Sequence, residues 1–179
     1  IHRWSKTYRL SEGDAIPAMD RLIEWLPQNI PPGDETTLIH GDFRMDNMVF
    51  HPTEPKVIAL LDWELATLGH PVGDFTYTLM GWRLGKDLFR GIADADLPAL
   101  GIPTEDEYIA QYCAATGRDE VQNLEWYLAY NMFRLAAILQ GIAKRAQDGT
   151  AASPHAMEQG RRAGPLAEAA WQQVERLAR

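Results

Sequence analysis

A polar loop between two apolar runs is the feature that most constrains this chain. The loop is His40-Gly-Asp-Phe-Arg-Met-Asp-Asn47, with TTLI just before it and MVF just after it. Runs of this kind predict short buried strands, which would hold the loop in one reproducible geometry. Two aspartates, an arginine and an asparagine at such a point predict a site for something charged.

A small sheet followed by helices is the architecture predicted for the rest of the chain. Strands are expected at 36–40, 48–51 and 56–62, the last two forming a β-hairpin through the turn PTEP, and all three making one small sheet. The segment ATLGHPVGD is expected to be a loop. Apolar residues at helical spacing predict helices at 15–26, 74–84, 104–116, 119–147, 151–163 and 165–178.

Two helices carry additional local information. Thr104 with Glu107 three residues later is a capping-box pattern, which places a helix start there. In 119–147 the apolar positions fall on one stripe, so this helix is expected to run through the core. The stripe consists of Leu124, Leu128, Leu135, Leu139 and Ile142.

Composition excludes several classes of protein. The 179 residues are 46% hydrophobic, which fits one domain with a sizeable core, and the net charge of −8 without a Lys/Arg block disfavours nucleic-acid binding. No apolar run approaches the roughly 20 residues that span a bilayer, and no signal segment opens the chain, so a cytoplasmic protein without membrane contact is expected. Cys113 is the only cysteine, which excludes an internal disulfide, and it is expected to serve packing.

Three oxygen donors are expected to converge at the loop. Asn47 lies five residues after Asp42, and Asp62 stands at the end of the second hairpin strand, which would fold it back beside the loop. Two carboxylates and a carboxamide oxygen are the hard donors that Mg²⁺ takes, with phosphate oxygens and water completing its octahedron.

The same residues resemble a known pattern. Protein kinases place a catalytic aspartate five residues before a metal-binding asparagine, with a second metal-binding aspartate after a short hairpin. HGDFRMDN followed by LLDWE resembles the variant found in the aminoglycoside phosphotransferase and choline kinase group. RWSKTY, PAMDRLIEWLP, LDWELATLGHPVGDF and FRLAAILQGIAKRA resemble more closely the kinase-like domain that some proteins fuse to an acyl-CoA dehydrogenase.

The resemblance implies a role for each loop residue. Asp42 would orient and deprotonate the acceptor hydroxyl, and Asn47 and Asp62 would hold Mg²⁺ with ATP or GTP as phosphoryl donor. Arg44 would contact the γ-phosphate, the alternative being a surface salt bridge. His40 and Asp74 would support the loop from behind. Trp63 and Glu64 replace the Phe-Gly of protein kinases, which removes a glycine hinge and predicts a fixed metal site.

The acceptor is expected to be a small molecule. Only eleven residues separate Asp62 from Asp74, which leaves no room for the longer activation segment on which protein kinases dock a polypeptide. Tyr130 and Arg134, one helical turn apart and following Trp126, are candidates for lining the acceptor pocket. The alternative is core packing with Arg134 in a structural ion pair, since an arginine buried without an anion would cost several kcal/mol.

Other interpretations remain open at this stage. The loop could be a capped turn with solvated acids, or His40, Asp42, Asp62 and His70 could form a hydrolytic metal cluster, although that leaves Asn47 without a role.

The expected fold class is α+β and predominantly helical, the carboxy-terminal lobe of a protein-kinase-like phosphotransferase over 1–179. No Gly-x-Gly occurs and no strand-rich region precedes the loop, so the amino-terminal nucleotide-binding lobe is expected to lie outside this chain, which opens at Ile1. The chain alone is expected to be weak or inactive. The function predicted is phosphoryl transfer to a small hydroxylated acceptor, such as a hydroxyacyl thioester; the alternative is a non-catalytic nucleotide-binding pseudokinase or scaffold.

Overall fold

A computed structural model covers the chain and describes residues 1–179 except 12, 14, 34, 152, 178 and 179. The elements in chain order are α1 (His2–Leu10), α2 (Pro17–Gln28), β1 (Thr37–Ile39), η1 (Met45–Asn47), β2 (Met48–Phe50), β3 (Val57–Leu60), η2 (Trp63–Leu65), β4 (Thr67–Gly69), α3 (Val72–Leu79), η3 (Met80–Arg83), α4 (Lys86–Phe89), α5 (Glu105–Thr116), α6 (Leu124–Gln147), α7 (Ala156–Gly160) and α8 (Ala163–Leu177).

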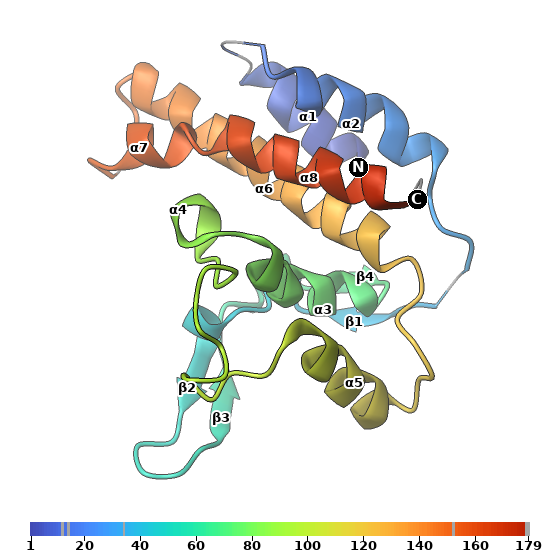
Figure 1. The fold of residues 1–179 in the computed structure, drawn as a ribbon. Helices are drawn as coiled ribbons and strands as arrows, with labels where there is room; N and C mark the ends of the chain where they lie inside the picture. Colours follow the sequence, from blue (N-terminus) through green and yellow to red (C-terminus); the bar gives the residue numbers. More distant parts are fainter. Residues whose placement is uncertain (12, 14, 34, 152, 178–179) are drawn as a thin grey trace.

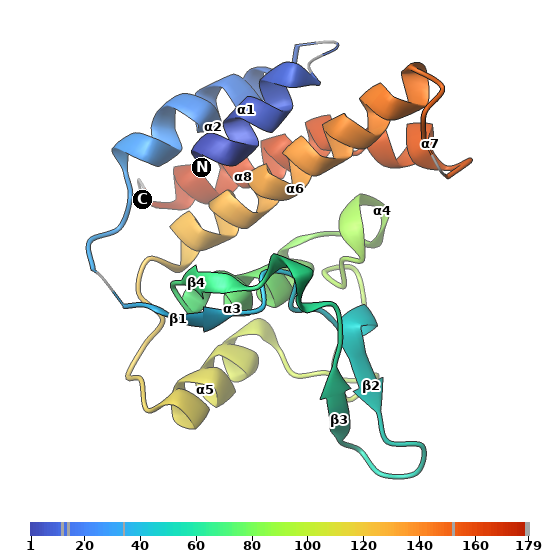
Figure 2. The same ribbon diagram turned by 180° about the vertical axis from the view of Figure 1, so that it is seen from behind.

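The long helix α6 is the centre of the fold. Figures 1 and 2 show α1, α2 and α8 packed along one side of it, with α3 and the β1–β4 ribbon on the other. Its central residues are buried on nearly every side, as expected for a helix enclosed by other elements rather than lying on a surface. The prediction that this segment runs through the core is confirmed, although the helix begins at Leu124 rather than at 119.

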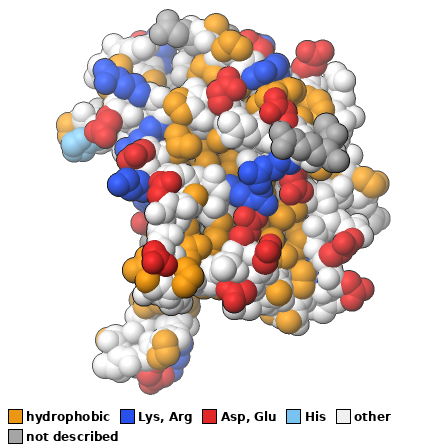
Figure 3. Space-filling model, viewed as in Figure 1, with side chains coloured by type: hydrophobic (Ala, Val, Ile, Leu, Met, Phe, Trp, Pro, Cys, Tyr) orange, Lys and Arg blue, Asp and Glu red, His pale blue; other side chains and the backbone are white. Residues whose placement is uncertain are grey.

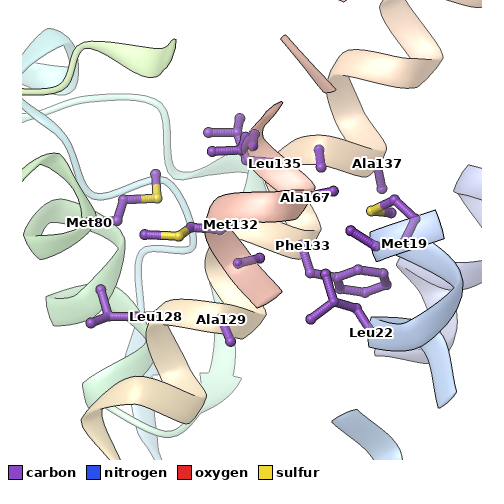
Figure 4. Close-up of a cluster of buried hydrophobic side chains, with 14 of the residues drawn as sticks. Met19, Leu22, Met80, Leu128, Ala129, Met132, Phe133, Leu135, Ala137 and Ala167 are labelled. Carbon is purple, nitrogen blue, oxygen red and sulfur yellow. The ribbon is translucent and has the colours of Figure 1, made fainter. Parts of the chain in front are cut away.

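Apolar side chains from α2, α6 and α8 meet in the main core. Figure 4 shows Met19 and Leu22 of α2 facing Phe133 of α6, with Ala167 of α8 beside them. All four are fully buried. Burying a side chain as large as Phe133 contributes about 1.5–3 kcal/mol, so this cluster ties the outer helices to α6.

The strands pair differently from the prediction. Among the described residues they form two antiparallel ribbons, β1 with β4 and β2 with β3, rather than one sheet. The predicted hairpin is confirmed as β2–β3, with a register shift between Val49 and Phe50. The prediction of a loop at ATLGHPVGD is wrong in part, because residues 67–69 form β4, which pairs with β1.

The strands next to the loop are also less buried than predicted. Leu38 of β1 and its cross-strand partner Leu68 of β4 are 63% and 72% exposed, and Phe50 of β2 is half exposed. A two-stranded ribbon has few neighbours to cover it, whereas an apolar run alone cannot reveal how many layers will pack on it. Figure 3 shows the β2–β3 hairpin projecting from the body as a spur.

The predicted helices correspond, with shifted ends, to α2, α3 with η3, α5, α7 and α8, whereas α4 was not predicted. Of the predicted ranges, residues 152 and 178 lie outside the described part of the chain. The helix α5 begins with the predicted capping box, in which the Thr104 hydroxyl accepts from the Glu107 N–H and the Glu107 carboxylate accepts from the Thr104 N–H. The helix α1 was not predicted, because its sequence is largely polar. Cys113 is buried and unpaired within α5, as expected for a packing residue. Throughout the described part of the chain, every helix is too short or too polar to cross a bilayer.

Candidate active site

Asp42 and Asn47 are joined directly. The Asn47 amide donates to Asp42 Oδ2 and to the Asp42 main-chain oxygen, each at 2.9 Å. The short helix η1 bridges the loop to β2 and brings residue 47 back over residue 42. Because the Asn47 nitrogen faces Asp42, the amide oxygen is left for another partner. The two residues are therefore in contact, as the sequence predicted.

Arg44 lies within the same network. Its Nε donates to Asp42 Oδ2 at 2.9 Å, and its guanidinium lies 3.8 Å from Asp46, which also pairs with Arg90 from the end of α4. The guanidinium of Arg90 is partly buried and lies near Arg44, and both effects lower the pKa of Arg90. Two arginines therefore stand at the loop. Arg44 forms ion pairs, as in the salt-bridge alternative, and its contact with the γ-phosphate stays a prediction.

His40 braces the loop through both ring nitrogens. Its Nδ1 accepts from the Asp42 N–H at 3.3 Å, so the ring is neutral there and its Nε2 donates to the Leu61 carbonyl at 2.8 Å. The ring also packs 4.7 Å from Trp63. His40 thus links the loop to the end of β3, in the supporting position predicted for it.

Asp74 supports the loop from helix α3. Its Oδ2 accepts from the His40 N–H and its Oδ1 accepts from the Gly41 N–H at 2.9 Å. Gly41 needs to be a glycine, because its φ is +81° and an added Cβ would lie 2.5 Å from the Leu65 oxygen. The main chain preceding Asp42 is therefore fixed by a carboxylate on one side and by tight packing on the other.

Asp62 is near the loop through its backbone rather than its side chain. The Leu61 N–H donates to the Asn47 carbonyl at 2.8 Å, which places the residue before Asp62 against residue 47. Asp62 has the left-handed conformation, with φ of 64° and ψ of 57°, which is uncommon for a non-glycine residue. Its exposed carboxylate makes no hydrogen bond or ion pair with another of the described residues.

The hydrolytic-cluster interpretation is wrong. Among the described residues, no three His, Cys, Asp or Glu side chains stand together as a set of metal ligands. Both nitrogens of His40 are engaged, and His70 lies in a different cavity, stacked 5.0 Å from Tyr127 and 3.7 Å from Glu35. Burial there lowers the pKa of His70 despite the opposing charge of Glu35.

Tyr77 is a site residue that the sequence reasoning missed. It lies on α3 three positions after Asp74, is only 6% exposed, and has its phenol beside Asp42. Burial, with the Asp42 charge as a second cause, raises the pKa of Tyr77 to about 12. Helical spacing could have found it, because residues three apart on one helix share a face.

Tyr130 and Arg134 line a cavity that reaches the loop. Its volume is about 230 Å³, and its walls come from α1, α6, the loop residue Gly41 and the segment after Asp62. Arg134 donates to the Gly41 carbonyl and places its guanidinium 5.1 Å from the Tyr77 ring. The alternative of a structural ion pair at Arg134 is wrong for the described residues, since no carboxylate pairs with it. Helix α1 was not predicted, so Trp4, which also lines this cavity, was missed.

A mostly helical chain with a hairpin-borne Asp/Asn loop of this kind has the architecture of the carboxy-terminal lobe of kinase-like phosphotransferases. The phosphotransferase enzyme family (APH) matches residues 1–130. A solved structure from Ralstonia eutropha, named as an aminoglycoside phosphotransferase, is 54% identical with a TM-score of 0.92, and the match covers 98% of this chain and 54% of that one. The chain therefore belongs to the phosphotransferase enzyme family.

Curated relatives extend well beyond this chain. Mouse acyl-CoA dehydrogenase family member 10 is 46% identical over 96% of this chain and 16% of its own length. Mouse acyl-CoA dehydrogenase family member 11 is 38% identical over 100% of this chain and 23% of its own length. The chain thus spans less than a quarter of these relatives, as in a piece of a fused protein.

Proposed function

We propose that this chain is the catalytic lobe of a kinase that transfers the γ-phosphoryl group of ATP or GTP to a hydroxyl of a small molecule. The observation that carries the proposal is the unit formed by Asp42, Asn47 and the end of β3. The Asn47 side chain bonds Asp42, and its main-chain carbonyl accepts from the Leu61 N–H. Asp42 and Asn47 therefore share one hydrogen-bonded structure with Leu61, the residue before Asp62, which supports the roles proposed for the three side chains.

The residues present fit a magnesium ion. Asn47 turns its amide nitrogen to Asp42, which leaves its oxygen available, and the exposed Asp62 carboxylate forms no ion pair with another of the described residues. These are oxygen donors of the type that Mg²⁺ prefers, and they would hold it. When bound, the ion would neutralise charge on the nucleotide phosphates. The left-handed backbone at Asp62 supports a functional role for this residue.

Asp42 would orient the acceptor and take its proton. In the reaction the acceptor oxygen forms a bond to the γ-phosphorus, the bond from that phosphorus to the bridging oxygen breaks, and the hydroxyl proton passes to the carboxylate. Both loop donors, Arg44 Nε and the Asn47 amide, contact Oδ2, so neither of them occupies Oδ1. Phosphoryl transfer requires mainly alignment and charge neutralisation, which a carboxylate fixed in this way provides.

Arg44 would serve the transferring phosphoryl group. Its ion pair with Asp42 keeps its guanidinium beside the carboxylate that would accept the proton. A planar guanidinium binds phosphate oxygens in a bidentate manner, so Arg44 could bridge Asp42 and the γ-phosphate. His40 and Asp74 would maintain the loop without touching substrate.

The acceptor pocket would be the cavity beside Gly41, lined in part by Tyr130 and Arg134. Its volume of about 230 Å³ is below the range usual for drug-sized ligands, which favours a small metabolite. The names of the relatives point to two acceptor classes, a hydroxyacyl thioester or an amino sugar. Residues 1–179 would work with a preceding lobe that grips the nucleotide, and alone they would bind Mg-ATP weakly.

The proposal is tested by measuring ADP or GDP release from the full-length protein that contains this chain. Wild type, Asp42→Ala and the control Asp87→Ala, an exposed position on α4, would be mixed with Mg-ATP or Mg-GTP and a panel of hydroxylated metabolites. We expect acceptor-dependent release from wild type and the control, and almost none from Asp42→Ala. Equal release by all three proteins would remove the assignment of Asp42. Nucleotide binding without release from wild type would instead favour the pseudokinase alternative.

A further inference from the structure

The cavity beside Gly41 contains a buried positive charge without a matching carboxylate. Arg134 is 9% exposed, and its Nε is buried with no hydrogen-bond partner. Its only protein acceptor among the described residues is the neutral Gly41 carbonyl, reached through one terminal nitrogen. A buried charge is costly unless an anion faces it, and the described residues supply no anion for this guanidinium.

Arg118 shows how a carboxylate neutralises an arginine elsewhere in the molecule. Arg118 makes a bidentate pair with Glu35, whose hydrogen bond raises the pKa of Arg118. Arg118 is more exposed than Arg134, so its need for a partner is smaller, yet it has one. The Nε of Arg118 is also buried without a hydrogen-bond partner, so Arg134 differs from Arg118 in having no carboxylate among the described residues.

Arg3 adds a second positive charge to the same cavity. Its guanidinium lies 5.1 Å from the centre of the Trp4 indole, and that of Arg134 lies 5.5 Å from the same ring. Arg3 and Trp4 come from α1 and Arg134 from α6, so two helices far apart in sequence place both cations around one indole. Two arginines against an aromatic ring suit a ligand with an anionic end and an apolar body.

The one carboxylate in the cavity wall is already engaged. Asp74 contributes to the lining, but its two oxygens accept the His40 and Gly41 N–H groups. The remaining walls are largely apolar, from Ile39, Leu65 and Tyr130. The formal charge of the lining side chains is therefore positive, two arginines against one aspartate.

We infer that the acceptor of this enzyme carries an anionic group, a carboxylate or a phosphate, that binds Arg134 while its hydroxyl faces Asp42. The inference rests on the proposed function for the identity of the site, and it adds the charge class of the substrate. Arg134 is then a specificity residue. Arg134 bonds the carbonyl of Gly41, the residue before Asp42, and both Arg134 and Asp42 lie beside the Tyr77 side chain.

The binding test uses the Trp4 indole as a local reporter. In the full-length protein with ¹⁵N-labelled tryptophan, the Trp4 N–H resonance is assigned by its loss in Trp4→Phe. We expect 3-hydroxybutyrate to shift this resonance in wild type and its uncharged amide to leave it in place. Glycerol 3-phosphate against glycerol makes the same comparison for phosphate. A shift with only one of the two acids identifies which anion the site takes.

Variants at two arginines of α6 separate charge from structure. Arg134→Gln keeps an N–H donor for the Gly41 carbonyl but removes the charge, and we expect it to abolish the shift, with Arg134→Lys restoring part of it. Arg145→Gln, an exposed position three turns along the same helix, is the control and should respond as wild type does. Equal shifts for acid and amide, no shift with either acid, or an unchanged response in Arg134→Gln, would overturn the inference.

The outcome is independent of catalysis. Anion binding through Arg134 in a protein that releases no ADP would leave this inference standing and remove the proposed function. ADP release that is equal for charged and uncharged acceptors would do the reverse. If both hold, Arg134→Gln should raise KM for the charged acceptor at least 10-fold and leave kcat for the uncharged one within about 2-fold.

Discussion

The two aspartates at the centre of the site differ in how the protein holds them. Asp42 accepts hydrogen bonds from Arg44 and Asn47, and the main chain before it is fixed by Asp74. Asp62, beyond the neighbouring strand, is exposed, left-handed and without a polar partner among the described residues. The protein therefore holds Asp42 in place, which suits the acceptor-facing role proposed for it, whereas the Asp62 carboxylate is available for a ligand.

From this difference we infer that Asp42 serves turnover and that Asp62 serves metal binding. A group already held in place needs no reorganisation when substrate arrives, which is what catalysis by alignment requires. A group without a partner gains one on binding, so its removal should affect affinity first.

The largest effect is expected for Asp42→Asn. The amide keeps the size of the side chain but cannot accept a proton, so kcat should fall by about 10²- to 10⁴-fold. The affinity for Mg-ATP should change little, because Asp42 is not a proposed metal donor. Steady-state kinetics and titration calorimetry on the full-length protein measure the two quantities. A variant that keeps its kcat would end the role of Asp42 as proton acceptor.

Asp62→Asn should show the converse pattern. We expect the dissociation constant for Mg-ATP to rise at least ~10-fold, since even groups that only support metal ligands cost ~10–100-fold when removed. Calorimetric titration with Mg-ATP gives the value, and Glu64→Gln, at an exposed position two residues on, is the control. Tight Mg-ATP binding by Asp62→Asn would show that the metal is held elsewhere.

Asp74→Asn should weaken the fold and the loop together. One of its two N–H partners, on His40 or Gly41, would face an amide nitrogen instead of an oxygen, which costs about 1–3 kcal/mol. Urea denaturation measures the loss in the free energy of unfolding, with Asp87→Asn as the surface control. No change in that free energy would mean that the Asp74 hydrogen bonds do not support the loop.

The smallest effect concerns Tyr77 and alkaline pH. Its pKa of about 12 in the folded protein exceeds the ordinary value of 10.0, so the unfolded chain loses the proton first as pH rises. Stability from this group is complete below pH 10 and falls between pH 10 and 12, by about 2–3 kcal/mol at most. Tyr77→Phe should lose less stability than wild type across this window in denaturation experiments. Parallel losses in both proteins would exclude Tyr77 as the source.

The contact between Asp42 and Asn47 could be predicted from sequence because it is local. Asp42 and Asn47 are five residues apart, so one short turn joins them whatever the rest of the chain does. The hairpin that precedes Asp62 could likewise be predicted, because a short turn connects its two strands. The capping box at Thr104 was confirmed for the same reason, since each partner lies within one helical turn of the other.

The contacts that sequence could not reveal are the distant ones. The pairing of β1 with β4 joins residues about thirty positions apart, and β4 lies in a segment whose two glycines and proline favoured a loop. Arg134 bonds the carbonyl of Gly41, which lies 93 residues before it in the sequence, and the α1 residues of the cavity belong to a helix of largely polar composition. Tertiary packing determined these arrangements, and local propensity carried no information about them.

The assignment of Asn47 and Asp62 as magnesium ligands can be tested by solving the structure of the full-length protein with Mg²⁺ and a non-hydrolysable ATP analogue. We expect one Mg²⁺ bound by the Asn47 amide oxygen and the Asp62 carboxylate at about 2.1 Å, with the γ-phosphate facing Asp42. Magnesium held by other residues, with the γ-phosphate turned away from Asp42, would contradict it.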